Sequence, residues 1–221
     1  MSLSFFPVEG EEVQSLKNKT LLIPACADSL IDNFALDWII QTLGLKSVAV
    51  LSSQYVQPLV QAPLFNSPRP VTTAMELYSL PDSEIAVIQI RSTVTSKSLL
   101  AQELTHFFAE KVKQIQIVAA CSGYLLSGAA LESTSRIRGR NVDSLPNLPE
   151  EIHCGGMTNA FLKQEGSKIF LAVSSGHGFD EIALLSEQLA SAVLQHVLSS
   201  GPICHFKQLQ VPLSVKQLLT V

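Results

Sequence analysis

Several features that would assign this chain to a class of protein are missing from its sequence. Lys and Arg are scattered and the formal net charge is −4, so there is no basic patch to neutralise nucleic-acid phosphates. The longest apolar runs, such as 115–121 and 169–173, are far below the roughly 20 residues that cross a bilayer. Residues 1–14 turn acidic early and lack the regions of a secretory signal. We therefore expect no contact with nucleic acid or membrane, and a location in the cytosol or the nucleus.

No cysteine or histidine spacing typical of a metal site is present. The four cysteines lie far apart, without a C-x-x-C pair: Cys26, Cys121, Cys154 and Cys204. In a reducing compartment such thiols usually stay free and buried. The pairs at 153–154 and 204–205 combine His with Cys, but adjacent residues rarely reach one ion together. We therefore expect no metal site.

The glycine-rich and nucleophile motifs of common enzymes are absent as well. Neither G-x-G-x-x-G nor a P-loop occurs, so no such loop is available to hold nucleotide phosphates. The G-x-S-x-G elbow of many hydrolases is also missing. The composition, with 47% hydrophobic and 15% charged residues, instead fits a folded domain with apolar surface for a partner. We expect no cofactor and no enzymatic activity.

The residues that are present alternate between strand and helix patterns. Short apolar and β-branched runs predict buried strands at 20–24, 47–53, 85–90, 115–122 and 169–175. Apolar residues at helical spacing predict helices at 33–44, 96–113 and 181–200. Asp32 and Asp180 are the expected caps of the first and the last helix. The stretch "ELYSLPDSEIAVIQIRS", residues 76–92, predicts two antiparallel strands around a Pro-Asp-Ser turn.

This order of elements predicts the fold class. Alternating strands and helices indicate a three-layer α/β/α domain with a mainly parallel, mixed sheet. We assign the domain to residues 20–200, between an N-terminal segment, 1–19, and a C-terminal tail, 201–221. A single domain is the expectation for a chain of 221 residues.

Two regions are less regular. Residues 55–70 contain four prolines among apolar residues, which predicts a long loop suited to a partner contact. Farther on, Arg136, Arg138 and Arg140 alternate as they would on one face of an exposed strand. We interpret them as a solvated strand face, with a contact to an acidic partner as the alternative.

Ligand sites in open α/β sheets lie at the carboxyl ends of the strands. The candidate residues at those ends are Asp28, Arg91, Ser122, Ser175, His177 and Asp180. Arg91 could hold a phosphate, although an arginine at a strand end more often pairs with a nearby carboxylate or carbonyl. Ser175, His177 and Asp180 have the types of a catalytic triad, but residues so close on one turn cannot easily aim at one another. Gly155-Gly156 could start a helix that binds an anion, and a simple turn is the favoured interpretation.

Four stretches of the sequence together resemble the proteasome assembly chaperone 2 family. They are "TLLIPACADSLIDNFALDWIIQTLGLKSVAVL" from Thr20, "ELYSLPDSEIAVIQIRS" from Glu76, "GGMTNAFL" from Gly155 and "SSGHGFDEIALLSEQL" from Ser174. The most specific part is "LYSLP" followed by "IQIRS", and the helix "ALDWIIQTL" is next. The resemblance covers about residues 20–198.

This resemblance implies a scaffold rather than an enzyme. Proteins of the family look like a nucleoside-phosphorylase-type α/β fold that is used without catalysis, and they pair as a heterodimer with a related first assembly chaperone. The heterodimer attends the α-subunit ring of the 20S proteasome, where it promotes assembly and prevents off-pathway association. Arg91 would then belong to the framework of a strand end or an interface.

The C-terminus departs from the family's pattern. Chaperones of this heterodimer often end in a hydrophobic residue, a tyrosine and any residue, and this tail enters pockets between α subunits. The present chain ends in Leu219-Thr220-Val221, with threonine in place of the tyrosine. These three residues are the candidate partner-binding residues, and the resemblance does not carry the usual mode of docking over to them.

Two alternatives from other classes stay open. The first is a nucleoside phosphorylase or hydrolase that uses Arg91 for an anion and Asp180 at the base. The second is a structural subunit of another complex. Turnover of a nucleoside by the purified protein would favour the first, and co-purification without proteasome subunits would favour the second.

Overall fold

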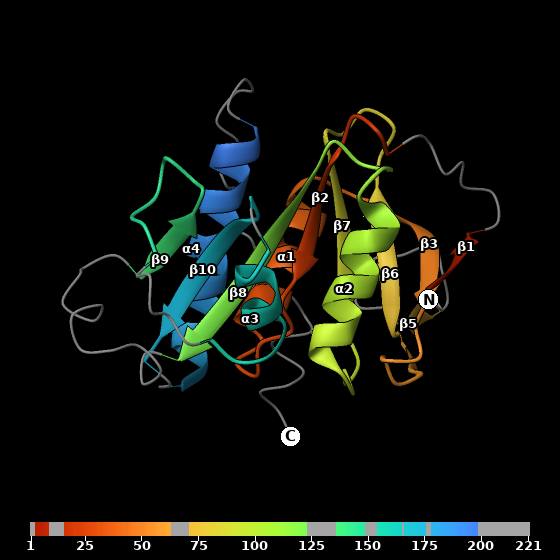
Figure 1. The fold of residues 1–221 in the computed structure, drawn as a ribbon, viewed down its shortest axis with the longest axis horizontal. Coiled ribbons are helices and arrows are strands. Elements are labelled where there is room, and N and C mark those ends of the chain that lie inside the picture. Colours follow the sequence, from red (N-terminus) through yellow and green to blue (C-terminus); the bar gives the residue numbers. More distant parts are fainter. Residues whose placement is uncertain are drawn as a thin grey trace.

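A large mixed sheet runs through the middle of the molecule (Figure 1). The computed structural model describes residues 3–8, 16–62, 71–122, 136–148, 154–164, 166–175 and 178–198, which contribute eight strands to this sheet. In spatial order these are β1 (Ser4–Pro7), β3 (Lys46–Ser52), β6 (Met75–Ser79), β7 (Ile85–Ile90), β2 (Thr20–Pro24), β8 (Gln114–Ser122), β10 (Lys168–Ser174) and β9 (Ile137–Arg140). Two short strands, β4 (Val60–Gln61) and β5 (Thr72–Thr73), pair with each other.

The prediction of a mainly parallel sheet is wrong. Among the described strands, three pairs in the large sheet are parallel, β2–β7, β2–β8 and β8–β10. Four are antiparallel, β1–β3, β3–β6, β6–β7 and β9–β10. The hairpin between β6 and β7 follows the sequence prediction, and β6 then pairs with β3, which puts two strands between β3 and β2. Sequence pattern did not reveal this, because a buried strand is apolar whichever way its neighbours run.

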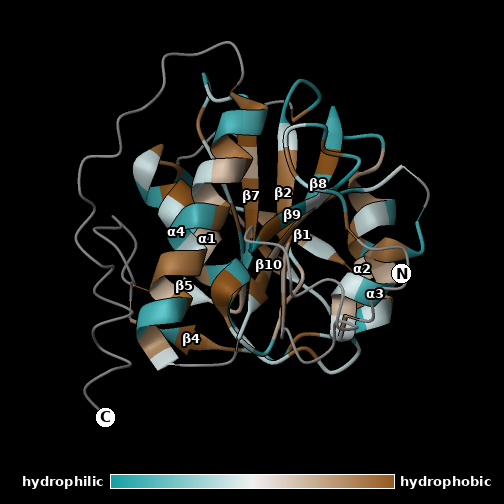
Figure 2. Cartoon of the chain, turned by 90° about the vertical axis from the view of Figure 1, so that its left-hand side faces the viewer, coloured by the Kyte–Doolittle hydropathy of each residue, from teal (hydrophilic) through white to brown (hydrophobic). Residues whose placement is uncertain are grey.

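Helices cover both faces of the sheet. Those in the described residues are α1 (Ile31–Thr42), α2 (Lys97–Phe108), α3 (Gly156–Leu162) and α4 (Gly178–Val197). α1 packs with α4 on one face and α2 with α3 on the other (Figure 2). Side chains alternate between the faces along each strand, so Leu21 and Ile23 pack towards α2 and α3, whereas Leu22 packs towards α1 and α4. This arrangement confirms the α/β class.

Two helices begin differently from the prediction. Asp32 is not the cap of α1; Leu30 takes that position with a φ of 59°, and Asp32 lies buried in the first turn. α4 begins at Gly178, so Asp180 also lies inside the first turn rather than before it. An acidic residue is favourable both at the cap and in the first turn of a helix. The sequence pattern could not separate the two positions.

The glycine pair starts a helix and is not a simple turn. Gly155 is the extended cap of α3, and Gly156 is its first residue, with a φ of 66°. A Cβ atom at residue 156 would lie 2.6 Å from Cδ of Lys97, at the start of α2. The absence of a side chain therefore serves both the left-handed backbone and the close approach of the two helices.

The interpretation of Arg136, Arg138 and Arg140 as one solvated face is also wrong. Arg136 is exposed, but Arg138 is only 7% exposed. The reason is the segment that follows β9: residues 146–148 return along the outer edge of this strand, and one of their carbonyls accepts a hydrogen bond from Arg138 at 3.3 Å. A loop thus covers the edge strand that the sequence left open to solvent.

The predicted 55–70 loop is described only as far as residue 62. Val56 is buried and forms an isolated bridge with Val94. Val60, in β4, leaves 69% of its surface exposed. Backbone hydrogen bonds between residues 55–57 and 93–95, and the pairing of β4 with β5, hold the described half of the loop to the fold, while Val60 presents an apolar side chain outwards.

The division into residues 1–19, 20–200 and 201–221 stays a prediction. β1 from the first segment joins the same sheet as the rest, and the C-terminal tail lies outside the described residues. Within the described ranges, no helix is both long and apolar enough to span a membrane.

Candidate functional site

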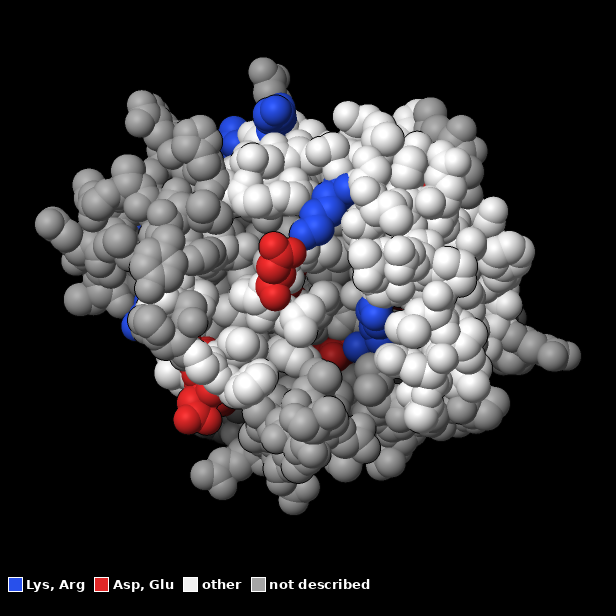
Figure 3. Space-filling model, turned by 90° about the horizontal axis from the view of Figure 1, so that it is seen from below, with Lys and Arg blue, Asp and Glu red and all other residues white. Residues whose placement is uncertain are grey.

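A cleft of about 830 Å³ opens at the carboxyl ends of β2 and β7. Its walls come from the residues that follow these strands, from the amino-terminal parts of α1 and α2, and from the β4 segment. Because β2 and β7 are parallel, they end at the same edge of the sheet, where the sequence predicts ligand sites. Figure 3 views this end of the molecule and shows that its described surface is mostly uncharged, with a few acidic and basic side chains close together.

A buried ion pair forms the base of the cleft. The Arg91 guanidinium donates two hydrogen bonds to the Asp37 carboxylate, at 3.1 Å and 2.7 Å. The two side chains are only 8% and 3% exposed. Gln89 also donates to Asp37, at 2.7 Å, and to the carbonyl of Asn33 at 2.8 Å. Arg91 thus pairs with a local carboxylate, as the favoured interpretation of the sequence has it.

A chain of further hydrogen bonds extends from Arg91 into the sheet. Arg91 bonds the Tyr78 hydroxyl, which donates to the carboxylate of Glu76 at 2.5 Å. Glu76 accepts the backbone N–H and the hydroxyl of Thr73 at 3.0 and 3.1 Å. Burial is the largest influence on the pKa of Arg91 and lowers it, but the charge and hydrogen bonds of Asp37 together with those of Tyr78 outweigh burial and raise that pKa. Burial raises the pKa of Tyr78, so a neutral phenol lies beside the Arg91 cation.

A second ion pair lies at the rim of the cleft. Lys97 Nζ is 2.9 Å from Asp28, whose side chain is fully exposed, whereas the Lys97 side chain is 29% exposed. The Lys97 side chain passes close to Gly156, where a Cβ atom would lie 2.6 Å from its Cδ, and it lines the cleft. A pair in such solvent contact contributes little to stability. It does neutralise both charges at the mouth of the cleft.

The loop after β2 forms one wall and is held by Asp32. This carboxylate is fully buried and accepts the backbone N–H groups of Ala27 and Asn33, each at 3.0 Å. Burial raises its pKa to about 6, although the two hydrogen bonds work in the opposite direction. Cys26 and Leu30 hold left-handed backbones, with φ of 51° and 59°, which are rare for such residues. Burial also raises the pKa of the Cys26 thiol, so it is not a thiolate nucleophile.

Of the residues predicted for a site, the structure brings Asp28 and Arg91 to the cleft. Ser175 lies elsewhere, where its hydroxyl donates to Glu181 at 2.6 Å beside Arg136. Asp180 is exposed on α4. The structure does not describe the side chain of Ser122. It also does not describe His177 or the C-terminal residues Leu219, Thr220 and Val221. The described members therefore do not assemble into a triad.

Sequence reasoning missed Asp37 and Lys97. Asp37 stands between Leu36 and Trp38 in the apolar stretch of α1, and a carboxylate on a buried helix face was the available signal. It pointed to a buried cation, which Arg91 supplies. Nothing in the sequence around Lys97 distinguishes it from the other surface lysines.

The charged side chains that line the cleft are paired. The four charged residues in its lining pair with one another, Arg91 with Asp37 and Lys97 with Asp28. The part of the chain that the structure describes contains no group of three or more His, Cys, Asp or Glu side chains that could hold a metal ion. Leu30 in the lining is 45% exposed, and Val60, which lies between the lining residues Leu59 and Gln61 but is not itself in the lining, is 69% exposed. The cleft thus offers an apolar rim over a neutralised polar base.

Two curated proteins that resemble part of this chain carry the same name. No protein-family model matches it. Proteasome assembly chaperone 2 of Mus musculus is 29% identical over 132 residues, which cover 57% of this chain and 50% of that protein. The Xenopus laevis protein of the same name is 33% identical over 101 residues, or 42% of this chain and 37% of that one. The chain spans half or less of the length of these curated relatives.

Solved structures share the fold over most of the chain. Pyrococcus furiosus PbaA, an archaeal homolog of proteasome-assembly chaperone, aligns with a TM-score of 0.65 at 13% identity, covering 99% of this chain and 93% of that one. P. furiosus PbaB, an archaeal proteasome activator, aligns with a TM-score of 0.60 at 17% identity, covering 98% and 93%. The curated relatives confirm the resemblance to the proteasome assembly chaperone 2 family, and the solved structures show a fold like that of PbaA. The likeness to nucleoside phosphorylases stays a prediction.

Proposed function

We propose that this chain is a proteasome assembly chaperone subunit, which pairs with a related chaperone and binds the α-subunit ring of the 20S core particle. The observation that carries the proposal is the sequence similarity to curated proteins named proteasome assembly chaperone 2. Bound to the ring, the chain promotes its assembly and prevents off-pathway association. It works in the cytosol or the nucleus.

A partner of the same fold is supported by the structural relatives. PbaA and PbaB both align with this chain over almost its whole length, and their names connect both with the proteasome. Two proteins that share this fold and whose names both refer to the proteasome are what we expect if related subunits of this fold work together as a pair. We accordingly propose a first-chaperone-type subunit as the partner in the heterodimer.

The geometry of the cleft supports stoichiometric binding rather than catalysis. Arg91 is committed to a buried carboxylate, and the Cys26 thiol is protonated. Leu30 and Val60, by contrast, present apolar surface beside the cleft, which is the kind of surface that a partner buries. We propose that the apolar rim, which consists of Leu30 and Leu59 of the lining together with the neighbouring Val60, is part of the partner contact.

Co-expression tests the proposal. The full chain is expressed with a first-chaperone-type subunit and α subunits, and complexes are separated by size-exclusion chromatography. Co-elution is expected, and a chain that elutes alone in every combination overturns the proposal. Turnover of a nucleoside by the isolated chain would also contradict it.

A matched pair of surface variants locates the contact. Val60→Asp should weaken co-elution, because it puts a charge on the apolar rim, whereas Phe6→Ser alters an exposed side chain on the edge strand β1, which does not line the cleft, and should not. Both side chains are more than half exposed, so neither change should unfold the chain. Equal binding by the two variants would remove the rim from the interface.

A further inference from the structure

The cleft at the ends of β2 and β7 follows from the topology of the sheet. The two strands are parallel neighbours, but the helices that come after them lie on opposite faces, where α1 packs with α4 and α2 packs with α3. Neighbouring strands whose connections diverge in this way leave a crevice at their carboxyl ends. The volume of about 830 Å³ is within the range of roughly 300–1,000 Å³ that is usual for binding clefts.

The lining of the cleft favours an uncharged occupant. Its four charged side chains form two ion pairs with one another. A charged occupant would have to break one of these pairs or lie unpaired against apolar groups, and both cost free energy. The larger apolar residues of the lining are Leu30, Phe34, Pro58, Leu59, Ile90 and Val94. Apolar side chains of a partner therefore fit the cleft, and charged ones do not.

An amide oxygen in the lining calls for a hydrogen-bond donor. Asn33 lies in the first turn of α1 and lines the cleft. Its backbone N–H donates to Asp32 at 3.0 Å, and its carbonyl accepts from Gln89 at 2.8 Å. Its side-chain oxygen is buried and accepts no hydrogen bond from any residue that the structure describes. Buried polar atoms are nearly always paired, and a peptide backbone supplies both an N–H and a C=O, so it serves either orientation of the amide.

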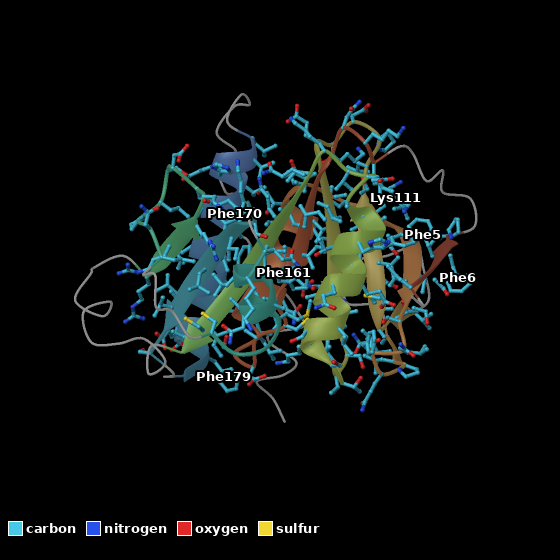
Figure 4. All side chains as sticks on the ribbon, in the orientation of Figure 1. Phe5, Phe6, Lys111, Phe161, Phe170 and Phe179 are labelled. Carbon is cyan, nitrogen blue, oxygen red and sulfur yellow. The ribbon has the colours of Figure 1, made fainter. Side chains whose placement is uncertain are left out.

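Exposed apolar surface continues from the cleft towards α4. α1 and α4 follow parallel strands and run in the same direction, and the Ser186 hydroxyl donates to the carbonyl of Ile31, at the start of α1, at 3.1 Å. Phe179 stands on the same face of α4 two turns earlier, so it lies beyond the start of α1. Figure 4 shows it at the end of the molecule where the cleft opens. Phe179 is 58% exposed and Leu30 is 45% exposed, so an occupant of the cleft finds further apolar surface beside the apolar rim.

We propose that the cleft holds an extended, uncharged segment of the partner chaperone, with an apolar side chain between the walls and a backbone N–H on Asn33 Oδ1. This inference rests on the proposed function and adds the form and the chemistry of the contact. An extended segment has backbone N–H groups free to donate, whereas those inside a helix are used within the helix. A cleft with two walls also accepts a single segment more readily than the flat face of a folded subunit.

Photo-crosslinking in the co-expressed complex tests the proposal. The cross-linking residue p-benzoylphenylalanine replaces Phe34 or Leu59, which both line the cleft. Phe6 is the control position, because it is 55% exposed on β1, at the outer edge of the sheet (Figure 4). The full chain is purified with a first-chaperone-type subunit and α subunits, irradiated and digested, and the joined peptides are identified by mass spectrometry. Positions 34 and 59 should join to one continuous, uncharged stretch of the partner chaperone, and position 6 should not join to it.

Other products overturn the proposal. Adducts from positions 34 and 59 to separate parts of the partner would show that a folded surface covers the cleft. Adducts to an α subunit or to a second copy of this chain would show a different occupant. A complex that co-elutes but gives no adduct at either position would leave the assembly role standing and remove the segment from the cleft. If no complex forms, the proposed function itself fails, so the two failures are distinguishable.

A synthetic peptide with the sequence of the cross-linked stretch tests the part of Asn33. The peptide carries a terminal dye, and its dissociation constant with the isolated full chain is measured by fluorescence anisotropy. Asn33→Leu should weaken binding about fivefold, because one hydrogen bond is lost. Asn159→Leu, a change at an exposed asparagine of α3, should leave the dissociation constant unchanged. Equal values for the two variants would refute the hydrogen bond to Asn33, and a peptide that does not bind at all would refute the segment.

Discussion

Replacing Arg91 by methionine should destabilise the folded chain strongly, because it leaves the Asp37 carboxylate without its cation. Asp37 is 3% exposed and Arg91 is 8% exposed, so water cannot take over the lost interaction. Breaking a buried ion pair costs about 3–5 kcal/mol. Gln89 still donates to Asp37 at 2.7 Å, which places the expected loss near the lower end of this range.

The double variant Arg91→Met with Asp37→Leu should recover most of that loss. Both charges are then gone, and Gln89 keeps its hydrogen bond to the Asn33 carbonyl. The Tyr78 hydroxyl loses one donor, which costs about 1 kcal/mol. We therefore expect the double variant to lie within about 2 kcal/mol of the unmodified chain, because apolar residues often replace a buried pair without loss.

Urea unfolding measures these differences. Trp38 is the single tryptophan and is 6% exposed on α1, so its fluorescence reports the loss of the fold. With a slope of about 2–3 kcal/mol per molar urea, the Arg91→Met midpoint should fall by roughly 1–2 M. As a control, Lys97→Met with Asp28→Ala removes the exposed pair and should not move the midpoint measurably. A loss below about 1 kcal/mol for Arg91→Met, or a double variant as unstable as the sum of the singles, would refute the reasoning.

Two further changes test the walls of the cleft. Asp32 has its pKa raised by burial from 3.8 to about 6, so the folded chain binds this proton more tightly than the unfolded chain does. The free energy of unfolding of the unmodified chain should therefore fall by up to roughly 3 kcal/mol more than that of Asp32→Asn as the pH rises from about 4 to 6. If urea titrations give the two proteins parallel curves of stability against pH, this reasoning is wrong. Gly156→Ala should lower the free energy of unfolding by about 1–2 kcal/mol or more, because residue 156 has a φ of 66° and a Cβ atom there would clash with Lys97. Gly155→Ala is the control: its Cβ atom would meet no atom within 4 Å, so the free energy of unfolding should change by no more than about 1 kcal/mol. Equal urea midpoints for the two glycine variants would show that neither strain nor the clash matters.

The location of the cleft was predictable, but its contents were only partly so. Strand runs such as residues 20–24 and 85–90 are recognisable in sequence, and parallel strands of this kind end at a common edge. Asp28 and Arg91 were found in this way. Asp37 reaches Arg91 from the middle of a helix, and Lys97 reaches Asp28 from the start of another helix. No local pattern encodes such contacts, since they depend on how the helices are docked.

Arg138 makes the same point away from the cleft. Its alternation with two other arginines is a pattern of exposed strands, and the strand exists as β9. Its burial follows from a loop that folds back over the edge. Neighbours in space, rather than neighbours in sequence, set the exposure of a side chain on an edge strand.

The sequence by itself determined which residues form the buried strands and most of the helices, because apolar spacing and turn residues act over a few positions. It also carried the likeness to a family of assembly chaperones. Only the tertiary structure decided the order and direction of the strands and the partner of Arg91. Each of these depends on contacts between segments that are far apart along the chain, and their free energies come from packing and burial that no single segment possesses alone.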